Sequence, residues 1–562
     1  MNDDKKRDLK SEEDPKSNKT IKFDQEDTKP VPPKPQPKEP EPKPFFRKKS
    51  SSASEDIPEK EGAEKKEEQG KNKGLGDKPD EKLPFAEDLK RRLSRVKLTR
   101  WIRFAVVSIL FFLLVIWIGN PWLFIFWLLL IDIYITAYVP WTWWKNTKGY
   151  TRMLLGWLDA IIYALVLVYI IFAFIGQNYK IPSSSLEKSL LVGDFLWVNK
   201  TTYGPRVPNT PLHFPLAQHT MPIFGGKSYI DKPQFEYHRL PGLREVERGD
   251  IVVFNFPQGD TVFSRLPDKD YYEESYRLRM QGLNPSEYYQ YNQMQYGDII
   301  VRPVDRRENY VKRVVGLPGE RLQMVNDTVY INGKPIGFAD NVQFNYIIPV
   351  TAPIPDDRWL QLGVRREDHG PAPFSGLEMG GALYYTVPLT AEMKRVVESW
   401  PEVSGALIKE NDAGFLDKSN FIWPIDNSWG WTTSNTDEFW IPKRGKTLEL
   451  TLNNLPLYRR AVETYEGNTV EVKNGRIFIN GEDNPYYTFK MDYYWMMGDN
   501  RDRSKDSRYF GLVPEDHIVG TPARILISID EERSITDINK IRWNRILANP
   551  NPDKKKAAEK NW

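Results

Sequence analysis

Three consecutive serines, Ser183 to Ser185, follow a proline in the stretch IPSSSLEKSLLVGD and are candidate nucleophiles. A serine hydroxyl is a weak nucleophile and needs an adjacent base. Histidine is the usual base, but the chain has only 5 His and none is near the triplet in sequence. The alternative base is a neutral lysine.

Lys312 is in the apolar run NYVKRVVGLPGE, beside Val311 and Val314. An ordinary lysine has a pKa of ~10.4, so about one in a few thousand is neutral at pH 7. Burial disfavours the ammonium and can lower this pKa by several units. Neighbouring side chains on a strand point to opposite faces. The run is therefore consistent with a buried Lys312 and an Arg313 that points away, or with a solvated Lys–Arg face.

The segment GDNRDRSKDSRYFG, which begins at Gly498, interleaves acidic, basic and hydroxyl side chains. It lacks the glycine and glutamate spacing of a calcium-binding EF-hand loop, and its arginines oppose a bound cation. A network of Asp–Arg pairs that holds a site and orients a base is the better interpretation. With 0 Cys and scattered His, the sequence predicts no metal and no cofactor.

The elements that position these residues begin with a membrane region. Residues 1–87 are rich in Lys, Glu, Asp, Pro and Ser and predict a disordered cytoplasmic tail. Region 88–177 predicts three transmembrane α-helices, at about 102–118, 122–139 and 154–176. Basic residues before the first span and in the loop WTWWKNTKGYTR predict that both face the cytoplasm. Everything after Gln177 should then lie outside.

From residue 178 onward, short β-rich runs separated by Gly, Pro, Asn and Asp predict a mainly β domain. The Gly-Asp-Ile run occurs twice, in Arg248–Phe254 and in Gly297–Val301. The net charge of +3 gives no argument for nucleic-acid binding. The predicted parts are 178–340 with a helical insertion at 258–296, an inserted or cap region at 341–490, a return segment at 491–530 and a C-terminal tail at 531–562.

Four segments in this order resemble the bacterial type I signal peptidase (leader peptidase) family. They are a Pro-Ser-x-Ser block after a transmembrane span, RGDIVVF, VKRVVGLPGE and GDNRDRSKDSRYFG. The resemblance covers blocks between Tyr179 and Ile529, and the last two motifs are highly specific. It implies a signal-peptidase-like β-fold with inserted subdomains. Both Gly-Asp-Ile runs, Arg248–Phe254 and Gly297–Val301, are candidates for the equivalent of the family strand. It also implies a membrane-bound serine endopeptidase that removes signal peptides from exported preproteins after small residues such as Ala.

By this resemblance, Ser185 is the nucleophile and Lys312 is the general base of a Ser–Lys dyad. The Ser183 hydroxyl and the Ser185 backbone N–H would line the oxyanion hole. Ser184 occupies a variable position between them.

The resemblance also assigns supporting residues. Ser504 would orient the lysine, Asp506 and Arg508 would form an ion pair, and Asp499 would belong to the surrounding structural loop. The substrate would bind as an added strand along edges that include Tyr179, Ile181, Pro182, Tyr310 and Val311.

The implied partners are exported preproteins and the lipid bilayer, with the secretion machinery as a further candidate. The implied location is the bacterial cytoplasmic (inner) membrane, with a multi-pass anchor and an extracytoplasmic catalytic domain. Two alternatives stay open: a catalytically inactive relative that acts as a binding protein, and a specialised assembly factor.

The sequence departs from the family pattern at Leu186 and Lys188, where Met and Pro are common. Ser185 and Lys188 also form a Ser-x-x-Lys pattern similar to that of penicillin-recognising enzymes, but the sequence lacks the Ser-Asp-Asn and Lys-Thr-Gly partner motifs. Lys188 could contact the substrate beyond the scissile bond or face water.

Overall fold

The computed structural model describes residues 84–119, 121–141, 143–222, 225–337, 339–369, 383–411, 421–425, 429–552 and 554. The predicted disordered tail lies outside the described residues up to position 83. Helix α1 (Phe85–Ser94) begins within the last residues assigned to that tail.

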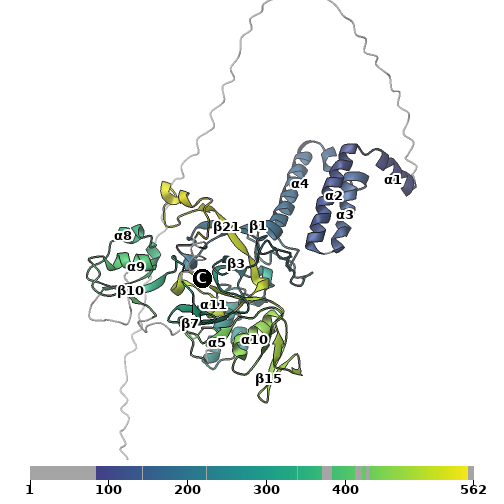
Figure 1. Ribbon diagram of the computed structural model, residues 1–562. Helices are drawn as coiled ribbons and strands as arrows, with labels where there is room; N and C mark the ends of the chain where they lie inside the picture. The colour runs from purple at the N-terminus through teal and green to yellow at the C-terminus, as the bar shows by residue number, and fades with distance from the viewer. Residues whose placement is uncertain are drawn as a thin grey trace, which may run out of the picture. The chain divides into compact units, whose positions relative to one another are not determined.

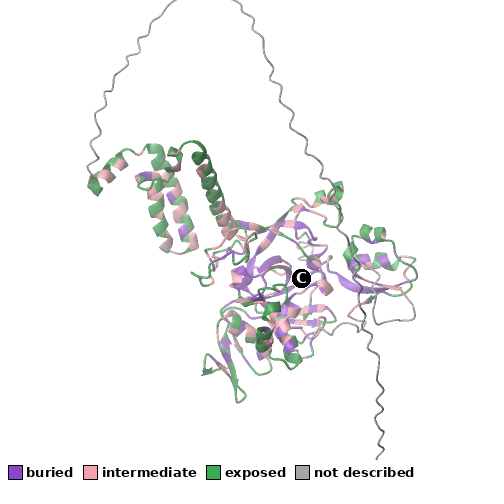
Figure 2. Cartoon of the chain, turned by 180° about the vertical axis from the view of Figure 1, so that it is seen from behind, coloured by how far each residue is buried: buried purple, intermediate pink, exposed green. Residues whose placement is uncertain are grey.

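Among the residues that the structure describes, two helices are long and apolar enough to cross a membrane. They are α2 (Leu98–Ile118) and α4 (Gly149–Ile170), and a π-helical turn extends α4 to Ile175. Their side chains are mostly exposed (Figure 2), as expected for helices whose apolar surface contacts lipid instead of a protein core. The predicted apolar helices over 102–118 and 154–176 are confirmed.

The predicted span at 122–139 is wrong in length. Its continuous apolar helix, Leu123–Thr136, is shorter than the ~17–25 residues that a regular span needs. The Asp132 carboxylate accepts hydrogen bonds from the N–H groups of Tyr138 (2.7 Å) and Val139 (3.1 Å), which ends the helix. The segment has three short pieces: a 3-10 helix (Pro121–Phe126), α3 (Trp127–Ile131) and a π-helical turn (Asp132–Thr136).

Helix α2 and the α3 segment form a hairpin (Figure 1). The Trp127 indole Nε1 donates a hydrogen bond to Ser108 Oγ at 3.0 Å between them. Arg92, in α1, donates to the carbonyl oxygens of Thr136 and Ala137 at 3.1 and 3.0 Å. The chain therefore returns at Ala137 to the end from which α2 starts.

A seven-stranded antiparallel sheet forms the centre of the β-domain. Strand β19 comes from the far end of the sequence and pairs with β6, so the two motif-bearing segments become neighbours. In spatial order the strands are β1 (Gly176–Lys180), β2 (Asp194–Asn199), β21 (Ile518–Ser528), β3 (Ile251–Asn255), β6 (Asn309–Gly316), β19 (Tyr493–Met497) and β20 (Val513–Pro514).

Strand β3 is a continuous apolar run that is buried on both faces of this sheet. Val252 and Phe254 belong to one buried cluster, whereas Ile251 and Val253 belong to another that includes Leu186. This alternation follows from the two-residue period of a strand. The second cluster packs the turn that carries the serine triplet onto the sheet.

The insertion between β3 and β6 contains three helices and a two-stranded sheet. Its elements are β4 (Thr261–Phe263), α5 (Tyr271–Met280), α6 (Pro285–Tyr291), α7 (Gln293–Tyr296) and β5 (Ile299–Val301). Its own buried cluster consists of Phe263, Leu278, Tyr289 and Tyr296. Of the two Gly-Asp-Ile candidates, β3 lies beside the strand of Lys312, while β5 pairs with β4.

Residues 339–369 and 383–411 form a small domain around the fully buried Trp359, which we call the cap domain. Its described elements are β10 (Phe344–Val350), α8 (Asp356–Gln361), β11 (Leu383–Leu389), α9 (Ala391–Glu398) and β12 (Ile408–Lys409).

The remainder of the predicted 341–490 region shares a core with the main domain. That core includes Leu322 of β7 and Trp495 of β19, both fully buried. Among the described residues of region 341–490, only those of the cap domain thus form a separate core. The elements around the shared core are β7 (Arg321–Val325), β8 (Thr328–Ile331), β9 (Lys334–Pro335), β13 (Phe439–Trp440), β14 (Thr447–Glu449), α10 (Leu455–Arg460), β15 (Val470–Lys473), β16 (Arg476–Ile479), β17 (Glu482–Asp483) and β18 (Tyr486–Thr488).

The segment after β21 folds back along the sheet. Arg545 forms an ion pair with Asp194 at 2.6 Å, and the Leu547 N–H donates to the Ile525 carbonyl at 2.7 Å. The predicted C-terminal tail therefore contributes to the β-domain through residue 552.

Candidate active site

Ser185 and Lys312 meet across the sheet. Ser185 lies in a 3-10 turn (Ser184–Leu186) that follows β1, and Lys312 lies in the central strand β6. The Lys312 Nζ donates a hydrogen bond to Ser185 Oγ at 2.8 Å and another to the Val311 carbonyl at 3.1 Å. Both residues are buried, with 8% and 4% of their surfaces exposed. A serine hydroxyl thus lies in direct reach of a desolvated amine.

The pKa of Lys312 is lowered to about 8. Burial is the main cause, because it disfavours the ammonium form. The carboxylates of Asp506 and Asp499 act in the opposite direction, while Arg508 lowers the pKa further. A neutral lysine is accordingly accessible near physiological pH.

The loop after β19 fixes the backbone of the serine turn. The Asn500 N–H donates to the Ser185 carbonyl at 3.1 Å, and the Asn500 side-chain amide donates to the Ser184 carbonyl at 3.1 Å. Gly498 packs so closely that a Cβ there would lie 2.2 Å from Ser504 Oγ and 2.6 Å from the Ser185 oxygen. This contact requires glycine.

Asp506 and Arg508 form the ion pair that the resemblance implied. Two guanidinium nitrogens of Arg508 contact the two carboxylate oxygens of Asp506, each at 2.9 Å, and both residues are buried. The Asp506 carboxylate also accepts from the Gly498 N–H at 3.0 Å. Burial alone would raise the pKa of Asp506, but the Arg508 guanidinium and these hydrogen bonds lower it overall. Within the described ranges, no group of three or more His, Cys, Asp or Glu side chains could hold a metal ion.

The surroundings of Arg313 were missed at the sequence level. Arg313 is buried on the face of β6 opposite Lys312 and forms an ion pair with Asp499 at 2.6 Å. Asp499 also accepts a hydrogen bond from Ser189 Oγ at 2.6 Å. Burial would raise the pKa of Asp499, but Arg313 lowers it overall. Lys312 and Arg313 are therefore both buried instead of forming a solvated face. Lys312 contacts Ser185 and Arg313 contacts Ser189, so both hold the same serine-bearing segment.

Two predicted residues are not joined to the Ser–Lys pair by a hydrogen bond. Ser504 Oγ is buried and has no hydrogen-bond partner among the described residues. Ser183 is exposed, and its hydroxyl does not cap the 3-10 turn.

The predicted substrate edges lie on either side of the pair. Tyr179 belongs to β1, the edge strand of the seven-stranded sheet. Ile181 is buried and Pro182 is exposed just before the serine turn.

The second predicted edge is the start of β6. Tyr310 and Val311 pair with β3 on one side, whereas β19 pairs with β6 only from Arg313 onward. The Tyr310 ring stacks on Phe256 with centroids 4.4 Å apart. The backbone on the β19 side of Tyr310 and Val311 is thus outside the described strand pairing.

The cap domain is bonded to the same loop that holds Ser185. The Gln343 N–H donates to the Asp499 carbonyl at 2.8 Å, and the Arg501 N–H donates to the Gln343 carbonyl at 2.9 Å. The Asn345 N–H donates to the Asp502 carboxylate at 2.7 Å. No sequence motif indicated these contacts.

Lys188 does not take either of the two positions that the sequence left open. Its ammonium donates to the Gly363 carbonyl of the cap domain. Its backbone has a φ of 74°, in the left-handed region. A proline, whose φ is fixed near −65°, does not fit this conformation. The lysine of the Ser-x-x-Lys pattern therefore connects the serine turn to the cap domain.

The fold and the site define a class: a β-rich domain with a buried serine–lysine pair, preceded by apolar helices. Residues 154–348 and 483–527 match the model of the family described as "Signal peptidase, peptidase S26".

The similar proteins include Signal peptidase I of Buchnera aphidicola subsp. Schizaphis graminum (strain Sg), which is 24% identical over 401 residues, covering 69% of this chain and 79% of that protein. Signal peptidase I of Pseudomonas fluorescens is 25% identical over 173 residues, or 31% and 36% of the two chains. Signal peptidase I of Rickettsia massiliae (strain Mtu5) is 25% identical over 193 residues, or 34% and 48%. The matched part is thus less than half of the latter two relatives.

Proposed function

We propose that this chain is a membrane-anchored serine endopeptidase that removes N-terminal signal peptides from exported preproteins after small residues. The single observation that carries the proposal is the 2.8 Å contact between Ser185 Oγ and the buried amine of Lys312. The match to the signal peptidase family model supports the substrate class.

In the proposed mechanism, neutral Lys312 accepts the proton of Ser185 Oγ as this oxygen attacks the scissile carbonyl carbon. The C–N bond of the tetrahedral intermediate then breaks, and the lysine gives its proton to the leaving amine. This leaves the signal peptide esterified to Ser185. Neutral Lys312 then takes a proton from water as the water oxygen attacks the ester carbonyl carbon. The C–O bond to Ser185 breaks, the lysine gives the proton to Ser185 Oγ, and the signal peptide leaves with a free carboxyl group.

The developing oxyanion needs two donors. We assign the Ser185 backbone N–H and, after rotation, the exposed Ser183 hydroxyl. One such donor is commonly worth ~3–4 kcal/mol in the transition state. The Asn500 contacts to the serine turn support this role because they hold the backbone in place.

The substrate would add as a strand between β1 and the start of β6. Strand addition uses main-chain hydrogen bonds for affinity and pockets for alternate side chains for specificity. The edge position of Tyr179 and the open side of Tyr310 and Val311 support this path. A small residue before the scissile bond lets the chain approach the buried Ser185.

We propose that the β-domain lies outside the cytoplasm. The contact of Arg92 with Ala137 indicates that the hairpin returns the chain to its starting side. Lys145, Lys148 and Arg152 precede α4 and favour the cytoplasmic side there. A single outward crossing by α4 then puts the site where exported preproteins emerge.

The test is cleavage of a preprotein with an Ala-x-Ala-like site by the purified full-length protein in detergent, followed by N-terminal sequencing of the product. Wild type should cut after the small residue, and Ser185→Ala should lower the rate about 10⁴-fold or more. Ser184→Ala, which changes the neighbouring hydroxyl, is the matched control and should retain cleavage. Unimpaired cleavage by Ser185→Ala would contradict the proposal, and lack of any cleavage by wild type would favour an inactive binding relative.

A further inference from the structure

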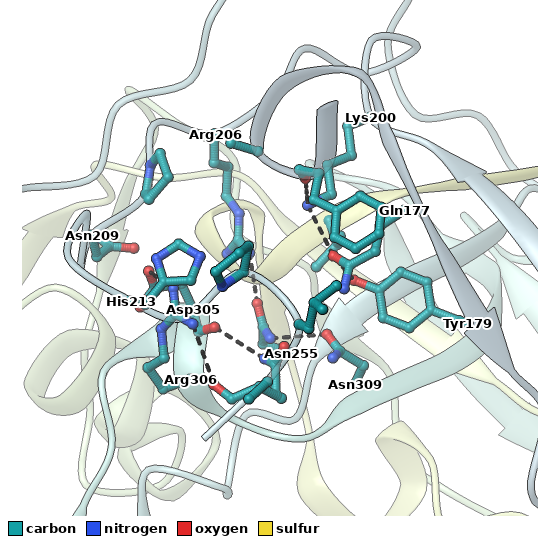
Figure 3. A pocket seen from close by; sticks show the side chains of 18 of the residues that line it. Gln177, Tyr179, Lys200, Arg206, Asn209, His213, Asn255, Asp305, Arg306 and Asn309 are labelled. Atoms are coloured by element: carbon teal, nitrogen blue, oxygen red, sulfur yellow. Dashed lines mark hydrogen bonds and ion pairs between the residues drawn. The ribbon is translucent and has the colours of Figure 1, made fainter. Parts of the chain in front are cut away.

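A cavity of about 320 Å³ lies where the chain passes from the end of α4 into the sheet (Figure 3). Phe172 and Ala173, in the last turn of the apolar helix, form part of its wall. Gln177 and Tyr179 of β1 form another part, and Asn309 of β6 a third. The cavity therefore lies between the membrane helix and the proposed substrate edges.

The charge of the lining is mostly positive. Lys180, Lys200, Arg206 and Arg306 contribute four cationic side chains, against the single carboxylate of Asp305 among the described lining residues. Lys180 forms an ion pair with Glu531, outside the lining, and Arg306 forms one with Asp305 at 3.3 Å, so the positive excess comes from Lys200 and Arg206. Such an excess of one sign within a concave, partly desolvated site favours a bound anion.

The two arginines and the carboxylate are fixed in place. Arg306 Nε donates to Thr210 Oγ1 at 2.7 Å, and Asp305 accepts from the Thr210 N–H at 3.0 Å. Arg206 donates to the Asn255 side-chain oxygen at 2.7 Å. These contacts hold the positive charges without neutralising them fully.

Lys200 has no such counter-charge. Its ammonium donates to the Phe172 carbonyl and, at 3.4 Å, to the Gln177 side-chain oxygen. In the described parts of the chain, no carboxylate lies within ion-pair distance of it. Burial first, and then repulsion from Arg206 and Arg306, lower the pKa of Lys200 to about 7, while Asp305 acts in the opposite direction. A bound anion would favour the ammonium form.

The wall formed by residues 206–218 is tied to the membrane helix. The Tyr169 hydroxyl donates to the Pro211 carbonyl at 2.8 Å, and its ring lies 4.9 Å from that of His213. The same loop exposes Leu212 and Leu216, which are 51% and 61% exposed. Exposed leucines beside the end of an apolar helix are suited to the boundary between headgroups and acyl chains.

We propose that this cavity binds the phosphate of an anionic phospholipid headgroup, with Lys200 as the direct contact. Arg206 and Arg306 supply a fixed positive field, and acyl chains lie along Leu216 and Phe172. Free phosphate shares the headgroup chemistry, but the apolar rim favours the lipid. The proposal depends on α4 crossing a membrane and is independent of the Ser–Lys chemistry.

The test is lipid retention by the full-length protein, measured by native mass spectrometry after incubation with equimolar phosphatidylglycerol and phosphatidylcholine. Wild type should retain phosphatidylglycerol preferentially. Lys200→Gln should weaken this retention about tenfold or more, equal to ~1.4 kcal/mol. The matched control is Lys227→Gln. It removes an exposed lysine that is paired with Asp231 and does not line the cavity, so lipid retention should not change.

A pH series supplies a readout that does not need a charge-removing variant. Retention by wild type should fall between pH 6 and pH 9 as Lys200 loses its proton, whereas Lys200→Arg should retain the lipid throughout. The charged groups facing this lysine are Arg206, Arg306 and Asp305. Burial lowers the pKa of Arg206 to about 10, which is still above this range. His213, whose pKa is lowered to about 4 by burial first and then by Arg306, stays neutral.

Three results would overturn the proposal. The first is equal phosphatidylglycerol retention by wild type and Lys200→Gln. The second is saturable binding of inorganic phosphate without preference between the two lipids, which would assign the cavity to free phosphate. The third is a Lys200→Gln variant that retains lipid as wild type does but has a raised KM for preproteins with an acidic residue before the cleavage site. This result would assign the cavity to a substrate side chain.

Discussion

The proposed lysine base determines how cleavage depends on pH. Burial lowers the pKa of Lys312 from 10.5 to about 8. At pH 7 about a tenth of the molecules then carry a neutral lysine, compared with roughly one in a few thousand at the ordinary pKa. The shift increases the population of the active form about 300-fold at this pH.

The expected profile of kcat/KM follows from this population. It should rise about tenfold per pH unit well below the pKa, reach half of its maximum near about 8 and then level off. Initial rates of the full-length protein in detergent, measured on one preprotein from pH 5 to 10, would give the profile. Lys312→Arg, which stays protonated, should lower the rate about 10²–10⁴-fold or more at every pH.

Lys188→Met is the matched control for this measurement. Lys188 is also half-buried and near the serine in sequence, and burial lowers its pKa, but its ammonium contacts the cap domain. The control should keep the half-point of the profile. A half-point between 6 and 7, as for histidine, or a half-point that moves in Lys188→Met, would refute the assignment of Lys312 as the base.

The same pKa shift makes a prediction about stability. The folded-state pKa of Lys312 is below its unfolded value, so its penalty is fully present below pH 8 and is lost as the pH rises toward 10.5. About 2.5 pKa units correspond to roughly 3 kcal/mol. Lys312→Met should therefore unfold at higher urea than wild type at pH 7, by up to about 3 kcal/mol, and this difference should shrink toward pH 10.5. A variant that is less stable at pH 7 would contradict this sign.

Three further changes test the framework around the pair. Gly498→Ala places a Cβ against the Ser185 carbonyl. The variant should lower the free energy of unfolding by ~1–3 kcal/mol and kcat/KM about 100-fold. Unchanged kinetics would mean that the loop does not position the serine. Arg313→Met leaves the Asp499 carboxylate buried without its ion pair. The variant should be less stable by ~3–5 kcal/mol in urea unfolding. A loss below about 1 kcal/mol would contradict the interpretation as a buried ion pair. Because the chain has 0 Cys, Leu243→Cys, at a position that is 81% exposed, gives a single thiol for a membrane-impermeant maleimide. The thiol should be labelled in intact spheroplasts. Labelling only after lysis would place the β-domain on the cytoplasmic side instead.

The pairing of Ser185 with Lys312 could be anticipated because each residue is in a short, readable motif. The apolar strand alone left Lys312 either buried or solvated, and the resemblance to the signal peptidase family assigned it as the base. The structure places its amine against the serine. The ion pair of Arg313 with Asp499 could not be anticipated in the same way. It depends on β6 and β19 becoming neighbours, and nothing in the local sequence of either strand encodes that adjacency.

The membrane region shows a similar limit. Hydropathy located α2 and α4, but it predicted too long a helix for the α3 segment. Apolar residues continue beyond Thr136, where the helix ends and the Asp132 carboxylate accepts from the following N–H groups. A carboxylate that accepts from following N–H groups is a local hydrogen-bonding effect, which a hydropathy pattern does not record.

The domain boundaries depended on long-range packing. The cap domain and the strands after it have similar β-rich sequences, yet only the cap domain has its own buried cluster. Likewise, no pattern predicted that Lys188 adopts a left-handed backbone conformation and contacts Gly363, because that contact joins segments far apart in the chain.

Covalent trapping would show whether Ser185 attacks the preprotein with Lys312 as its base. Wild-type protein mixed with preprotein and quenched in acid within the first turnover should carry the signal peptide as an ester. Tandem mass spectrometry should locate that ester on Ser185, and Lys312→Ala should form none. Turnover without an adduct on Ser185, or an adduct on another residue, would contradict the account.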